Sequence, residues 1–144
     1  MSLHGDHLEL ELPELASHLL NETGQLGDAP VNAASMLEFL KLEFAVLDIS
    51  ALLVGQKKQP RGVLSYSDRI VGIDTTLKDK PQRARFTTFH EIGHYVLPSH
   101  QQDLYICDDQ DLSFDTMIEV EKEANQFAAE VLFKGDQFTR EAND

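Results

Sequence analysis

Residues 90 to 94 read His-Glu-Ile-Gly-His, the pattern HExxH, in which two histidines stand four positions apart. On an α-helix both imidazoles lie on one face, one turn apart, and together they can bind one Zn²⁺. Glu91 stands beside them, where its carboxylate can take a proton from a water molecule that the metal activates. With 6 histidines in 144 residues, independent placement predicts only about 0.02 such patterns, so chance explains it poorly.

The pattern needs a helix to position it. One alternative is that Thr88 and Glu91 form a capping box, which requires a helix that begins at Thr88. The run Asp79-Lys80-Pro81 indicates an earlier start, with Asp79 as N-cap and Pro81 in the first turn, and Pro98 ends the element after Leu97. We therefore expect one helix of about 17 residues, with both histidines on the rim of its apolar stripe.

A catalytic zinc site normally takes three protein ligands, so a third must come from elsewhere. The last helix is expected to begin at Asp115 or Thr116, where Thr116 and Glu119 form a capping box, and to end at Gly135. Its apolar residues share one face, and Glu121 falls inside that face. A glutamate there is costly unless it is paired or metal-bound, which makes Glu121 the candidate third ligand.

Two further features of this helix support the same site. Asn125 lies one turn beyond Glu121, where it can hydrogen-bond a metal ligand from outside. The small residues Ala124 and Ala128, together with Gly93 of the first helix, would let the two helices approach closely. The remaining glutamates of the helix fall on the opposite face, where solvent tolerates them: Glu119, Glu123 and Glu130.

The segments 85–95 and 121–132 resemble the ImmA/IrrE family of metallopeptidases, and the resemblance extends over about residues 62–132. It implies a zincin-like core in which zinc is bound by the HExxH helix and by a glutamate of a later helix. In the wider thermolysin-like group, an Asp or Asn follows that glutamate by four positions, as Asn125 follows Glu121. The resemblance further implies an endopeptidase that cleaves helix-turn-helix repressors and so regulates mobile-element or stress genes.

A second function from another class is a non-proteolytic regulator, which would keep the zinc and act by binding a DNA-binding partner protein. Glu91 favours the enzyme, because a purely structural site needs no general base. Manganese is an alternative to zinc as the native metal. His100 and Tyr95 are candidates for contacting substrate or an oxyanion, as is Tyr105, although residues at such positions are more often plain surface.

The rest of the chain predicts an α+β fold with helices around a small antiparallel sheet. Gly62–Tyr66 and Ile70–Ile73 are expected to form a hairpin, whose edge could align an extended substrate. Residues 99–114 are expected to form an acidic loop. The other expected elements are helices at Pro13–Leu20 and Val31–Leu40 and a strand at Phe44–Ile49.

The composition is that of an ordinary soluble domain, with 42% hydrophobic and 26% charged residues. We expect one domain over residues 4–135, a cloning leader at 1–3 and a tail at 136–144. No stretch has the length and apolarity of a membrane span or the order of a signal peptide, and the single cysteine excludes an internal disulfide, which together fit the cytoplasm. A net charge of −13 disfavours direct nucleic-acid binding.

Overall fold

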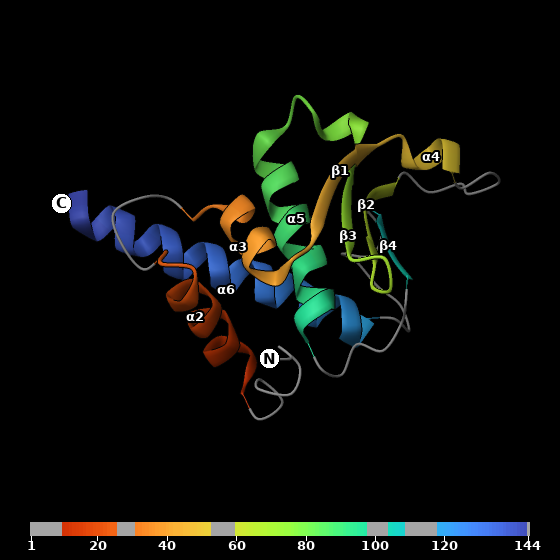
Figure 1. Ribbon diagram of the computed structural model, residues 1–144. Helices are drawn as coiled ribbons and strands as arrows, with labels where there is room; N and C mark the ends of the chain where they lie inside the picture. Colours follow the sequence, from red (N-terminus) through yellow and green to blue (C-terminus); the bar gives the residue numbers. More distant parts are fainter. Residues whose placement is uncertain (1–9, 26–30, 53–59, 98–103, 109–117, 144) are drawn as a thin grey trace.

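A four-stranded sheet and a group of helices on one side of it form the two layers of the protein (Figure 1). The computed structural model describes residues 10–25, 31–52, 60–97, 104–108 and 118–143. Helices α2, α3, α5 and α6 all lie on the same side of the sheet. This arrangement agrees with the α+β class that the sequence predicts.

The sheet has the strand order β1-β3-β2-β4. The expected hairpin is present as β2 (Pro60–Ser65) and β3 (Ile70–Asp74), which pair antiparallel. β1 (Glu43–Leu47) joins β3 in parallel, so the sheet is mixed and not wholly antiparallel. Because β1 and β4 flank the hairpin, the prediction that the hairpin itself offers an open edge is wrong.

Strand β4 (Leu104–Asp108) lies within the stretch that the sequence analysis assigned to a loop. It pairs antiparallel with β2, and the register shifts by one residue between Pro60 and Gly62 of β2. A strand of 5 residues carries little periodicity of its own, and pairing with a distant segment stabilises it. The loop prediction is therefore wrong over these residues, and the flanking residues lie outside the described part.

The N-terminal helices differ from prediction only at their ends. α2 spans Leu12–Glu22, and α3 spans Ala33–Leu40, where Asn32 caps the helix by accepting from the backbone N–H of Ala34 at 2.8 Å. The predicted strand at 44–49 ends early, because the chain turns into the short helix α4 (Ile49–Leu52). Asp74 then ends β3 and caps the 3₁₀ turn η1 (Thr75–Leu77).

Helix α5 spans Pro81–Val96, and Pro81 occupies its first turn as expected. Its N-cap residue is Lys80 and not Asp79, and no side chain caps the helix there. The helix tolerates the missing cap because Pro81 has no backbone N–H group that a cap would have to satisfy. Because the helix begins at Pro81, the alternative in which Thr88 starts it is wrong.

Helix α6 spans Ile118–Asn143 and continues through Gly135, so the prediction that Gly135 ends it is wrong. A glycine costs a helix only about 1 kcal/mol relative to alanine and does not stop it alone. The predicted capping residue Thr116 lies outside the described residues. None of the described helices has both the length and the apolar character that crossing a bilayer requires.

Helices α5 and α6 pack directly on each other, as the small residues predict. A Cβ atom added to Gly93 would lie 3.2 Å from Cβ of Phe127 and 3.3 Å from Cα of Ala124. Ala128 is fully buried, as are Phe89 and Ile92 on α5. A side chain at Gly93 would therefore require Phe127 or the backbone of Ala124 to shift by a few tenths of an ångström.

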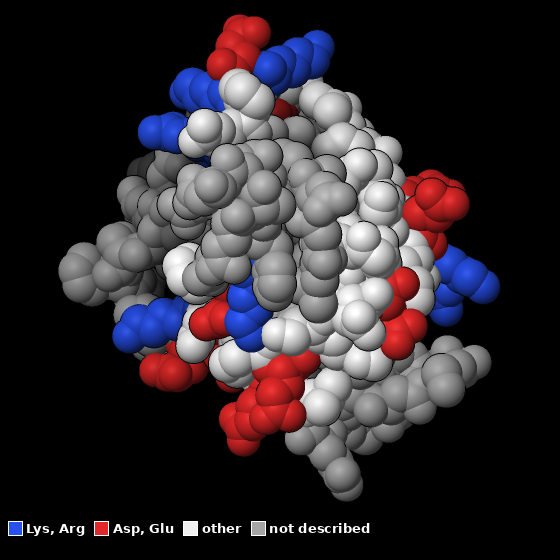
Figure 2. Space-filling view, turned by 90° about the vertical axis from the view of Figure 1, so that its left-hand side faces the viewer, with Lys and Arg blue, Asp and Glu red and all other residues white. Residues whose placement is uncertain are grey.

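The charged side chains are mixed on the face shown in Figure 2. Lys and Arg side chains of the described residues lie beside Asp and Glu there. The described acidic side chains thus form no single continuous surface on this face.

Candidate metal centre

The C-terminal half of α5 carries His90, Glu91 and His94 into the interior. All residues of this helix from Thr87 to Val96 are buried, and the exposed fractions of these three are 1%, 0% and 0%. The sequence predicts a rim position for the histidines, whereas the structure buries them completely. The reason is long-range packing, since α6 lies along α5 and the ring of Tyr105 from β4 covers His94.

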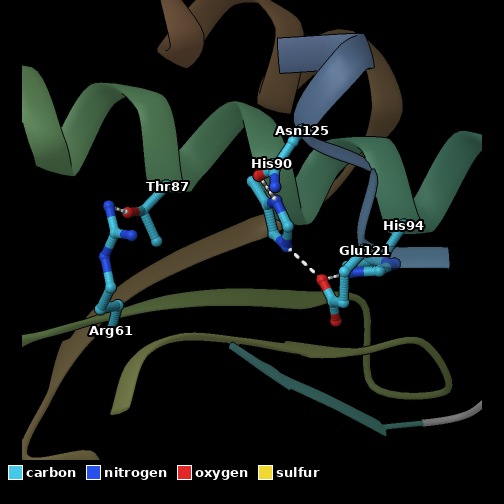
Figure 3. Close-up of polar contacts among 6 residues, drawn as sticks. All are labelled: Arg61, Thr87, His90, His94, Glu121 and Asn125. Atoms are coloured by element: carbon cyan, nitrogen blue, oxygen red, sulfur yellow. Dashed lines mark hydrogen bonds and ion pairs between the residues drawn. The ribbon is translucent and has the colours of Figure 1, made fainter. Parts of the chain in front are cut away.

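Glu121 of α6 points at both histidines (Figure 3). Its Oε2 atom lies 2.8 Å from Nε2 of His90 and 3.1 Å from Nε2 of His94. The three side chains each offer one donor atom, and these atoms lie within 4.8 Å of one another. The helical phase is as expected, because Glu121 is 4% exposed while Glu119 lies in solvent.

Asn125 fixes the orientation of His90 from the far side of the ring. Its Oδ1 atom accepts a hydrogen bond from Nδ1 of His90 at 2.7 Å (Figure 3). In a neutral imidazole that donates through Nδ1, the lone pair lies on Nε2, which here faces the carboxylate of Glu121. A lone pair and a carboxylate oxygen this close repel each other unless a proton or a cation binds both.

The charge state of Glu121 suits a metal ligand. Burial favours the neutral acid, but hydrogen bonds and charge from His90 and His94 outweigh it and lower the pKa of Glu121 to about 2. The carboxylate is therefore ionised at neutral pH. Two imidazole nitrogens and a carboxylate oxygen are donor types that zinc accepts, and this buried set could hold a metal ion.

Glu91 occupies the side of α5 that faces the sheet. A Cβ atom added to Gly62 of β2 would lie 2.8 Å from Oε2 of Glu91, so the carboxylate rests against the strand. Glu91 is not among the three clustered donors, although it follows His90 directly in the helix. Glu91 is therefore a buried acid beside the cluster that is not one of the candidate metal ligands.

Comparison with known families agrees with this arrangement. Residues 48–144 match the M78 peptidase family, described as the IrrE N-terminal-like domain. The chain belongs to this family. The ImmA/IrrE resemblance seen in the sequence is thereby confirmed, and a metallopeptidase-type function on a protein substrate follows. Searches of the curated proteins and of the solved structures find no significant match.

Of the two other candidate residues of this M78 chain, the structure describes Tyr95. Tyr95 is buried and packs its ring on Tyr66, with 5.0 Å between ring centroids. Burial, followed by the charge of Tyr95, raises the pKa of Tyr66. His100 lies outside the described residues.

Next to Glu91, the M78 chain has a contact that sequence reasoning missed. Gly62, Arg61 and Thr87 form a contact between β2 and α5, in which Nη2 of Arg61 donates to Oγ1 of Thr87 at 3.3 Å (Figure 3). An isolated glycine in a strand is a known sign of a bulge or of close approach, so Gly62 carried a usable signal. Arg61 and Thr87 carried none, because their contact depends on the fold.

Proposed function

We propose that this chain is a zinc-dependent endopeptidase in which His90, His94 and Glu121 hold the metal and Glu91 is the general base. The observation that supports this most directly is the convergence of three buried donors from α5 and α6, with a second buried carboxylate, that of Glu91, beside His90 on α5. A purely structural metal site would need metal ligands such as these three donors, but it would not need a general base such as Glu91.

When bound, zinc supplies Lewis acidity that polarises the scissile carbonyl and activates water. Glu91 takes the proton of the attacking water on its carboxylate and passes it to the leaving amine. Asn125 holds His90 in the tautomer that presents Nε2. Tyr105 supports the ring of His94 by stacking on it.

The substrate backbone is proposed to lie along β4. This strand is at one end of the sheet, and within the described residues only β2 pairs with it. Its Tyr105 contacts His94, so a segment added to its open edge would pass close to the donors. Addition of a strand to an open sheet edge is a common mode of peptide recognition.

We further propose that the substrate is a helix-turn-helix repressor, whose cleavage in the cytoplasm would release mobile-element or stress genes. The support is the family membership together with the ImmA/IrrE resemblance. The test incubates the zinc-loaded chain with the helix-turn-helix protein encoded beside it and follows cleavage by mass spectrometry.

The control for this test is Glu91→Gln, which keeps the size of the side chain and removes the base. We expect one zinc per chain in both proteins and at least about 10²-fold slower cleavage by the variant. Undiminished cleavage would remove Glu91 from the mechanism. Stable co-elution of the two proteins without cleavage would support the non-proteolytic regulator instead.

A further inference from the structure

Gly62 lies where strand β2 meets the turn of α5 that carries Glu91. A Cβ atom there would come 2.8 Å from Oε2 and 3.4 Å from Cγ of Glu91, and 2.5 Å from Cγ2 of Thr87. Contacts below 3.0 Å do not occur between such atoms without displacement. The volume that any other residue would fill is therefore taken by Glu91 and Thr87.

The strand is bulged at this point. Pro60 pairs with Asp108 and Gly62 with Cys107, so Arg61 is an additional residue on β2. A bulge redirects side chains, and here Arg61 reaches Thr87 on the same helix that Gly62 approaches. Thr87 precedes Glu91 by four residues, which is one helical turn. The bulge thus sets Arg61 and Gly62 against neighbouring turns of α5.

Glu91 has a long side chain that could adopt several rotamers on the helix. At 0% exposure its carboxylate cannot turn towards solvent, and the backbone of β2 at Gly62 bounds it on the sheet side. We propose that Gly62 is a positioning residue, whose missing side chain sets where the carboxylate of Glu91 stands. The catalytic meaning of this inference rests on the proposed function, but the contact itself does not.

The first experiment measures catalysis and metal together. Gly62→Ala should keep one zinc per chain and a KM within about threefold, while kcat falls by about 10- to 100-fold, because a displacement near 1 Å is costly at a reacting group. Gly72→Ala is the matched control. Its Cβ would lie 2.9 Å from Val63 and 3.0 Å from Leu47, so it crowds the same sheet away from Glu91 and should leave kcat unchanged.

A second variant separates the crowding of Glu91 from that of Thr87. Thr87→Ser removes Cγ2 but keeps the hydroxyl that accepts from Arg61. Added to Gly62→Ala, it should restore part of the lost Tm but not kcat. Recovery of kcat in this double variant would overturn the proposal, as would an equal loss of kcat in Gly72→Ala.

A third measurement needs no activity and uses the metal-free chain. If the methyl group added at position 62 clashes with Glu91 as well as with Thr87, Gly62→Ala should lower the Tm less in a Glu91→Ala background than in the wild type, and the loss that remains there should be the part due to Thr87. Equal losses in both backgrounds would overturn the proposal. If the wild type cleaves nothing, the proposed function fails, whereas this Tm cycle still decides whether Gly62 positions Glu91.

Discussion

The rings of Tyr105 and His94 are stacked, with 3.9 Å between their centroids and 10° between their planes. Tyr105 comes from β4 and is 4% exposed, so this contact joins the edge strand to the donor cluster. The stack fixes the plane of the imidazole, as Asn125 fixes that of His90 from the other side of the site. Two unrelated elements therefore orient the two histidines.

Replacement of Tyr105 should weaken zinc binding. Because contacts that orient metal ligands contribute about 10- to 100-fold in affinity, Tyr105→Leu should raise the zinc Kd by that factor, whereas Tyr105→Phe keeps the ring and should stay within about threefold. Competition with a chromophoric chelator measures the Kd. Tyr66→Leu, which removes a ring packed on Tyr95 and not on a histidine, is the control. A wild-type Kd in Tyr105→Leu would show that the stack does not hold the ligand.

Two glutamates on α6 test the helical phase of the site. Glu121→Ala should abolish stoichiometric zinc and cleavage, because it removes the carboxylate that meets both imidazoles. Glu119→Ala, two residues earlier and in solvent, should change the free energy of unfolding by no more than about 0.5 kcal/mol and leave zinc bound. Zinc content by atomic absorption decides between them. If only the Glu119 variant lost its zinc, the third ligand would have to come from another face of α6.

Zinc affinity should fall as the solution becomes more acidic. Histidine must be neutral to bind a metal, and free imidazoles titrate near about pH 6.5. Glu121 is ionised over this range, because hydrogen bonds and charge from His90 and His94 lower its pKa to about 2. Titrations from pH 8 to pH 5 should show an increasing Kd below about pH 6.5. A constant affinity over this range would mean that the two histidines are not ligands.

Asp74 should make the fold sensitive to acid. Its buried carboxylate accepts from the backbone N–H groups of Ile49 and Thr76 at 2.9 and 3.0 Å and from Oγ1 of Thr76 at 2.6 Å. Burial raises the pKa of Asp74, but these hydrogen bonds outweigh it and lower the pKa below 3.8. The stabilisation that these hydrogen bonds give to the folded state is thus complete above about pH 3.8. It is lost as the pH falls through the lower pKa that Asp74 has in the folded state.

The corresponding variant is Asp74→Asn, which replaces one acceptor oxygen by a donor. It should lower the free energy of unfolding at pH 7 by about 1–3 kcal/mol and flatten its decline below about pH 4. Urea unfolding at a series of pH values measures both effects. Asp79→Asn, at an exposed position, is the control. Identical acid profiles for the wild type and the Asp74 variant would contradict this account.

Local patterns in the sequence predicted the parts of the site that lie on single helices. The four-residue spacing of the histidines and the position of Glu121 on the apolar face of α6 both depend only on helical geometry. The hairpin likewise followed from two apolar runs around a short polar turn. These features need no knowledge of which elements become neighbours.

The features that escaped prediction depend on contacts between distant segments. β4 exists because β2 pairs with it, and the full burial of His94 depends on Tyr105 reaching it from that strand. The contact between Gly62 and Glu91 also joins two segments that lie far apart in the sequence. The end of α6 has a local cause instead, because a single glycine at position 135 lowers helix propensity without ending the helix.

Glu121, the third donor, lies on a different helix from the two histidines, 27 residues beyond His94. The cluster therefore exists only while α6 stays docked against α5, and a bound ion would resist their separation. If the proposed zinc binds there, it would act as a folding ligand, and each tenfold rise in its free concentration above the Kd would stabilise the native chain by about 1.4 kcal/mol. In a zinc-starved cell the same linkage would expose the chain to degradation, so its abundance, and not only its turnover, would follow the metal supply.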